Sequence, residues 1–307
     1  MDYVLKTENL TKVYGKNKVV NNVSMHVKKG DIYGFIGKNG AGKTTFMRMA
    51  SGLASSTAGE MELFEAGRTN AALEQSRNRI GTLIEEPGLY PNMSAKGNLE
   101  VVRRTFGITD KNAVMEMLEF VGLSGTNNKK VKNFSMGMKQ RLGLGIALLR
   151  NPDFLILDEP IDGLDPAGIK EIRELLLKIN QEREITILIS SHILGELSKI
   201  ATCYGIIRDG MLVEEFEADE LEQRCLRCQK LVVNDVEHAV SILEETLHIT
   251  NYDVQESNII RVFEQLEETE RTNRTLITGG IEIKESYLAG QDLEGYFMDL
   301  LEGEKYV

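Results

Sequence analysis

Apolar and polar positions change their spacing along the chain, and the changes predict an alternation of strands and helices in its larger, N-terminal part. Continuous apolar runs predict strands over Asp31–Ile36, Phe154–Leu157 and Ile185–Ser190, because short runs of this kind are typical of strands covered on both faces. Tyr3–Leu10 and Asn22–Lys28 show alternating or mixed patterns and predict strands that are partly exposed. The pattern as a whole indicates an α/β fold.

From Ser94 to Leu149 the pattern becomes helical. Ser94 and Ser135 are good N-cap residues, and they predict the starts of two helices in this region. A further helix is predicted over Pro166–Asn180, with proline in its first turn. We therefore expect a domain over residues 1–217 that combines a mixed β core with a helical subdomain at about residues 86–150.

The character of the chain changes near Phe216, where acidic residues crowd together. Beyond this point the pattern predicts the order strand, helix, strand, strand, helix, strand, followed by a last helix. These elements are expected at Lys230–Asn234, Val236–Leu247, Tyr252–Val254, Ile259–Phe263, Leu266–Arg274, Ile281–Glu285 and Asp292–Leu301. The order is typical of a βαββαβ unit, and it predicts a small accessory α+β domain over residues 218–307.

The chain has 307 residues, 42% of them hydrophobic and 27% charged, and its formal net charge is −11. This composition is typical of a soluble globular protein, and the acidity argues against nucleic acid as a partner. Three cysteines are too few for a disulfide framework, which favours a reducing compartment. No signal peptide is apparent, and no apolar stretch is long enough to cross a membrane. We therefore expect no direct membrane insertion, so that any membrane role depends on a partner.

A phosphate loop follows the predicted strand Asp31–Ile36. Its residues are Gly37, Lys38, Asn39, Gly40, Ala41, Gly42, Lys43, Thr44 and Thr45. The spacing G-x-x-x-x-G-K-[ST] wraps backbone N–H groups around nucleotide phosphates, and the helix that follows adds a favourable N-terminal dipole. We expect Lys43 to reach the β- and γ-phosphates and Thr44 to place its hydroxyl on Mg²⁺.

Three further side chains stand where strands end, and one aromatic side chain precedes the loop. Asp158 ends the apolar run Phe154–Leu157 and is expected to hold the metal, while Glu159 is the candidate general base. His192 follows Ser190-Ser191 and can orient a water or bond a phosphate oxygen. Tyr14 can stack on adenine, although a tyrosine packed beneath a turn is almost as good an interpretation.

A second phosphate-recognition pattern, which we call the signature segment, is Ser135–Gln140. It opens a helix with a serine and a glycine, a design that suits an anion. Because it is predicted to lie on the helical subdomain, remote from Lys43, we expect Ser135, Met136 and Gly137 to serve the nucleotide of a second copy. Taken alone, Ser135 is also an ordinary N-cap.

These motifs together resemble the ATP-binding subunits of ABC transporters, over about Tyr3 to Phe216. The matching parts are Gly37–Thr45 (Walker A), Ser135–Gln140 (signature), Phe154–Glu159 (Walker B and catalytic glutamate), Gly163-Leu164-Asp165 (D-loop), His192 (switch histidine) and Tyr14 (adenine-stacking aromatic). The resemblance implies a P-loop NTPase of ABC type that hydrolyses ATP with Mg²⁺. It also implies a homodimer with shared ATP sites, in which Asp165 contacts the partner's nucleotide. It further implies a membrane permease as partner and a place on the cytoplasmic face of the membrane.

The chain departs from the family pattern at three places. One is the D-loop, which is led by Ile161-Asp162 where asparagine or alanine types are common. Met138 stands where the family has a second glycine in its signature. Glu85, in Ile84-Glu85-Glu86-Pro87, stands where the family usually has glutamine, and it adds a possible metal ligand with a negative charge. A glutamate here resembles the branch that protects bacteria against lantibiotics and bacitracin-like peptides, and we expect a role in resistance to a peptide antibiotic or in its export.

Two other classes of protein remain open at this point. One is a soluble ABC ATPase that acts on ribosomes or DNA; such proteins usually carry two nucleotide domains or a long coiled-coil insertion, which this chain lacks. The other is a phosphate-loop kinase or GTPase, which would need no signature segment. A GTPase should also show an Asn-Lys-x-Asp motif, and Asn17-Lys18 is not followed suitably.

Overall fold

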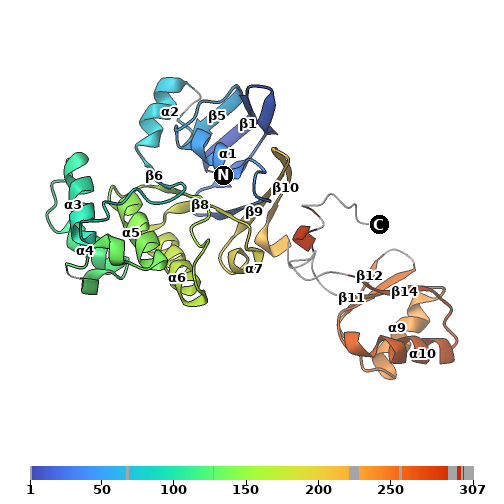
Figure 1. Ribbon diagram of the computed structural model, residues 1–307. Coiled ribbons are helices and arrows are strands. Elements are labelled where there is room, and N and C mark those ends of the chain that lie inside the picture. Colours follow the sequence, from blue (N-terminus) through green and yellow to red (C-terminus); the bar gives the residue numbers. More distant parts are fainter. Residues whose placement is uncertain are drawn as a thin grey trace. The chain divides into compact units, whose positions relative to one another are not determined.

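The computed structural model describes most of the chain and divides it into two compact units (Figure 1). The residues described are 2–66, 69–126, 128–220, 228–255, 258–289, 296–298 and 300. The first unit comprises residues 1–218 and 300–307. The second unit comprises residues 219–299. Among the residues described, no helix is both long enough and apolar enough to pass through a bilayer.

A six-stranded sheet forms the centre of the first unit, in the spatial order β10-β9-β4-β8-β7-β6. Its strands are β4 (Ile32–Ile36), β6 (Ile80–Leu83), β7 (Phe154–Leu157), β8 (Thr186–Ser191), β9 (Cys203–Arg208) and β10 (Met211–Glu217). All neighbours are parallel except β10, which forms an antiparallel hairpin with β9. Strands β4, β7 and β8 are buried along their whole length, as their apolar runs predict.

An antiparallel sheet packs over the first helix, in the order β2-β1-β3 with β5 also paired to β1. Its strands are β1 (Tyr3–Tyr14), β2 (Asn17–Val23), β3 (His26–Lys28) and β5 (Ala58–Leu63), and the helix is α1 (Lys43–Ala50). The prediction of one strand over Asn22–Lys28 is wrong. Strand β2 ends at Val23 and β3 begins at His26, and residues 24 and 25 belong to neither strand. The two strands pair with different stretches of β1.

Most helices of the first unit fall between Asn70 and Leu197 in the sequence. They are α2 (Asn70–Arg77), α3 (Ala95–Thr105), α4 (Ala113–Phe120), the short 3₁₀ helices η1 (Ser124–Thr126) and η2 (Val131–Asn133), α5 (Met136–Leu148), α6 (Pro166–Arg183) and α7 (Leu194–Leu197). Ser94 and Ser135 cap α3 and α5 through their hydroxyls, as predicted. Helix α5 contacts β6, and α3 and α4 pack on α5 (Figure 1). The sequence analysis did not predict α2 or α7.

The second unit has the βαββαβ order expected from the sequence. Its elements are β11 (Cys228–Val233), α9 (Val236–Glu245), β12 (Tyr252–Gln255), β13 (Ile259–Val262), η3 (Leu266–Glu268), α10 (Thr269–Thr278) and β14 (Ile283–Ala289). The sheet is antiparallel in the order β12-β13-β11-β14, and buried residues such as Leu231, Leu243 and Leu276 form its core. The last predicted helix, Asp292–Leu301, falls largely outside the described residues; 296–298 and 300 are helical.

Candidate active site

The phosphate loop joins the end of β4 to the start of α1. Gly40 and Gly42 have φ values of 85° and 108°, a conformation that side chains other than glycine adopt only at a cost. A Cβ on Gly37 would lie 2.5 Å from the carbonyl oxygen of Ile207, and one on Gly42 would lie 2.6 Å from that of Val19. The glycines are therefore needed for the loop's conformation and for its close packing on the rest of the chain.

A hollow of about 190 Å³ lies at the start of α1, on the loop. It is lined by Val19, Asn39, Gly40, Gly42, Lys43, Thr44, Thr45 and Glu159. Gly37, Lys38 and Ala41 belong to the same loop without lining the hollow. Val19 comes from β2, and nothing in its sequence context identifies it as a site residue.

Lys43 is buried at the base of this hollow, with 5% of its surface exposed. Its Nζ donates to the carbonyl oxygen of Gly37 at 2.6 Å and lies 3.1 Å from Oε1 of Glu159. A buried ammonium needs such partners because burial without them is costly. The lysine is thus held between the loop and the candidate base.

Asp158 lies at the carboxyl end of β7, directly across from α1. Its Oδ2 accepts from Oγ1 of Thr44 at 2.6 Å, and its Oδ1 accepts from Oγ of Ser190 at 2.6 Å. A hydroxyl and a carboxylate in contact are oxygen ligands of the kind that Mg²⁺ prefers. The residues present therefore fit a magnesium ion, as the sequence predicts for Thr44 and Asp158.

Glu159 connects two other predicted site residues. Its Oε1 faces Lys43, and its Oε2 lies 2.8 Å from Nδ1 of His192. Its backbone has a φ of 48°, a left-handed conformation that few residues other than glycine adopt. The structure thus brings Lys43, Thr44, Asp158, Glu159 and His192 together in one network.

Two residues that were not assigned to the site from the sequence form hydrogen bonds in or near this network. Ser190 is fully buried and bonds both Asp158 and the backbone of Glu159. Gln140 donates from Nε2 to the carbonyl oxygen of Pro160 at 3.1 Å, which ties α5 to the loop after Glu159. The run Ser190-Ser191-His192 was the available signal for Ser190, but it was used only for the histidine.

The signature segment and Asp165 lie outside the hollow of their own chain. Ser135 caps α5 by accepting from the backbone N–H of Met138, and Asp165 caps α6 by accepting from that of Gly168. Met136 is 48% exposed, and its Cε lies 3.9 Å from the position that a Cβ on Gly163 would occupy. The signature segment and the Gly163–Asp165 loop are therefore neighbours, and none of their residues lines the hollow at Lys43.

Tyr14 and Glu85 likewise do not line the hollow. Tyr14 is half-exposed at the end of β1, with Nζ of Lys12 at 4.8 Å from its ring centroid. Glu85 has a φ of 64°, is exposed, and forms an ion pair with Arg48 of α1. The predicted metal ligand is thus engaged elsewhere in this conformation.

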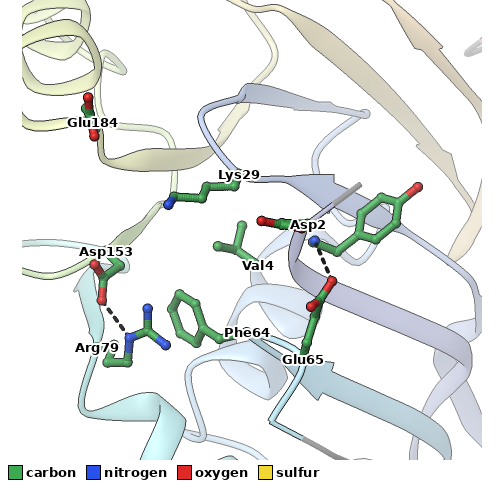
Figure 2. A pocket seen from close by; sticks show the side chains of 9 residues that line it. Asp2, Val4, Lys29, Phe64, Glu65, Arg79, Asp153 and Glu184 are labelled. Carbon is green, nitrogen blue, oxygen red and sulfur yellow. Dashed lines mark hydrogen bonds and ion pairs between the residues drawn. The ribbon is translucent and has the colours of Figure 1, made fainter.

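A second hollow, of about 210 Å³, lies at the opposite edge of the main sheet (Figure 2). Arg79 and Asp153, which precede β6 and β7, form an ion pair at 2.6 Å there, and the guanidinium of Arg79 lies 3.9 Å from the ring centroid of Phe64. None of the predicted site residues lines this hollow. This second hollow is therefore not the site that the sequence predicts.

Comparisons with known proteins show the family and the fold of the chain. Residues 20–162 match the family described as ABC transporter. The chain is 44% identical to the bacitracin transport ATP-binding protein BcrA of Bacillus licheniformis, covering 99% of both chains. It is also 44% identical to the lantibiotic transport ATP-binding protein SrtF of Streptococcus pyogenes, over 71% of this chain and 93% of that one. It resembles the ADP conformation of an ATP-binding cassette of an ABC transporter, at 27% identity and a TM-score of 0.64, over 74% of this chain and 95% of that one.

Proposed function

This chain belongs to the ATP-binding subunits of ABC transporters, and we propose on that premise that it drives resistance to a peptide antibiotic of the bacitracin type. Membership confirms the predicted fold class, a P-loop NTPase of ABC type, and makes the chain an ATPase. The bacitracin proposal is supported by the length of the match. Two relatives named as bacitracin transport proteins match over 99% of the chain, whereas the match to the lantibiotic relative covers 71%.

The alternative of a soluble ABC ATPase that acts on ribosomes or DNA is not favoured. The full-length relatives that carry a functional name are transport proteins, and the net charge of −11 does not suit a polyanionic partner. We therefore propose that the chain works with an integral membrane permease and lies on the cytoplasmic face of the membrane, without inserting into it and without binding nucleic acid.

One observation carries the proposed mechanism: the Glu159 carboxylate lies between Lys43 and His192. In this position it can take a proton from a water that attacks the γ-phosphate, while His192 orients that water or a phosphate oxygen. Lys43 is placed to move its ammonium from the Gly37 carbonyl to the phosphates.

Thr44 and Asp158 are the proposed Mg²⁺ ligands, and Glu85 is a third candidate. When bound, the ion would neutralise negative charge that develops on the phosphates during hydrolysis. Glu85 can take part only if its carboxylate leaves Arg48, with which it is paired. The remaining loop residues, Gly37, Lys38, Asn39, Gly40, Ala41, Gly42 and Thr45, hold the phosphates through backbone N–H groups and the start of α1, and Tyr14 stacks on the adenine.

A second copy is proposed to complete each site with Ser135, Met136, Gly137 and Asp165. Gly137 supports this role, because its own chain does not require a glycine there. Its φ is not positive, and a Cβ would meet only Cα of Gly168 at 3.8 Å, an ordinary contact. A glycine that its own backbone conformation does not require leaves room for another molecule to approach closely, and we propose that this molecule is the triphosphate bound to the partner.

The substitution Glu159→Gln tests the mechanism. It removes the base but keeps the size and much of the bonding of the side chain, so we expect ATP binding to persist and hydrolysis to fall by about a hundredfold or more. The variant should accumulate as an ATP-bound dimer, and light scattering measures its molecular mass in solution. Undiminished turnover would remove Glu159 from its role, and a chain that stays monomeric at saturating ATP would contradict the shared sites.

A further inference from the structure

We propose that Ser190 is a positioning residue for ATP hydrolysis, and that its hydroxyl sets the geometry of both acids at the end of β7. The hydroxyl donates to Oδ1 of Asp158 at 2.6 Å. It also accepts from the backbone N–H of Glu159 at 2.9 Å. One side chain thus bonds the proposed metal ligand and the proposed base, and the inference rests on the roles proposed above for these two residues.

The register of the main sheet explains why this serine can reach both acids. Strands β7 and β8 are parallel neighbours with Leu157 opposite Ile189, so the next position along each strand places Asp158 beside Ser190. Ser190 is fully buried, which leaves no exposed surface through which water could replace its hydroxyl. The contact is therefore built by the strands rather than by mobile side chains.

The hydroxyl has a single proton, and it donates this proton in the hydrogen bond to Asp158. This bond fixes the carboxylate of Asp158 so that Oδ2 faces Thr44, the side on which the metal is proposed to bind. The lone pair of the same oxygen receives the N–H of Glu159. The two bonds are compatible, because a proton that points toward Asp158 leaves the lone pairs of the oxygen available to the N–H of Glu159.

The bond to Glu159 acts on a strained backbone. Glu159 has a φ of 48°, and such conformations persist only where the surroundings hold them. In this conformation its carboxylate meets Lys43 and His192. Without the Ser190 hydroxyl, Glu159 loses a partner for its N–H and is free to relax, which would move the carboxylate away from the attacking water.

The test is Ser190→Ala in the full-length chain. We expect kcat to fall by about ten- to a hundredfold, because the base and the metal ligand are both displaced. KM should stay within about twofold, since the phosphate loop is untouched. Binding of a fluorescent ATP analogue and formation of the ATP-bound dimer should persist, and half-maximal activity should need more Mg²⁺.

Thr186→Val is the matched control. Thr186 is also fully buried on β8, and its Oγ1 accepts from the backbone N–H of Gly30 at 2.9 Å, but it lies at the other end of the strand. This variant loses a buried hydroxyl of the same strand, and we expect a lower melting temperature with kcat unchanged. Equal losses of kcat in the two variants would show that Ser190 serves the fold alone, and would overturn the proposal.

Ser190→Cys covers the case in which the alanine variant does not fold. The thiol fills the space but is a weak donor and acceptor, so we expect the same loss of kcat at unchanged KM. Wild-type kcat in either variant overturns the role of Ser190. Glu159→Gln, measured beside them, separates this outcome from a failure of the mechanism itself. If Glu159→Gln keeps full turnover, the proposed base is wrong. If Glu159→Gln loses turnover while the Ser190 variants stay active, only the inference about the serine is refuted.

Discussion

The two halves of the proposed ATP site differ in how far one chain completes them. On the phosphate-loop side, Lys43 and Asp158 are 5% and 7% exposed and are bonded to residues of their own chain. On the signature side, Ser135, Met136 and Asp165 are exposed and lie outside the hollow. The first half is thus assembled by folding. The second is presented on the surface, as expected of a contribution to another molecule.

The largest effect should come from breaking both halves in separate chains. We expect Lys43→Ala and Gly137→Asp each to lower turnover by about a hundredfold or more, because each spoils both sites of a homodimer. An equal mixture forms heterodimers with one site in which both halves are intact. Turnover should therefore recover to about a quarter of the wild-type value, given that half of the dimers are mixed. The measurement is ATPase activity of each protein alone and of the mixture.

Mixing Lys43→Ala with Glu159→Gln is the matched control for this experiment. Both changes lie in the same half, so each site of the heterodimer keeps one broken phosphate-loop side and no activity should return. Recovery in this control, or its absence with Gly137→Asp, would show that the signature segment does not act on the partner's nucleotide.

The sequence predicted local features of both halves better than contacts between distant segments. The phosphate loop is one continuous segment, and Phe154–Leu157 was predicted with its correct bounds because a short, fully buried strand is apolar throughout. The N-caps at Ser94 and Ser135 are local signals of the same kind. Such features need no knowledge of which distant residues come together.

Contacts between distant segments were not predictable. Val19 reaches the hollow from β2, and Arg48 meets Glu85, but the sequence shows neither contact. For Ser190, the run Ser190-Ser191-His192 marked the end of a strand but not the bond to Asp158. Strand β1 was expected to end at Leu10 but continues to Tyr14, because register shifts near Lys12 interrupt the alternation on which the prediction relied. Helix α2 was missed because, of its apolar side chains, only Leu73 is buried, so that its periodicity is weak.

A smaller effect should show whether the carboxylate of Glu85 leaves Arg48 to bind the metal. Its carboxylate is paired with Arg48, but both side chains are exposed, and such pairs are worth about 0.2–1 kcal/mol. If Glu85 leaves Arg48 to hold the metal, Arg48→Gln should lower the Mg²⁺ concentration for half-maximal activity by about two- to fivefold. Glu85→Gln should raise it. Shifts in the same direction, or no shift at all, would remove Glu85 from the metal site.

The smallest expected effect is on stability, and it separates the glycines of the two halves. Gly137→Ala should leave the free energy of unfolding within about 0.5 kcal/mol of the wild type, because the Cβ has room and alanine favours a helix. Gly37→Ala should cost about 1–3 kcal/mol, since its Cβ would lie 2.5 Å from the backbone oxygen of Ile207. Urea unfolding without nucleotide measures both. Equal losses of unfolding free energy in the two variants would mean that the fold of its own chain requires Gly137. The proposal that Gly137 contacts the partner's nucleotide would then lose its support.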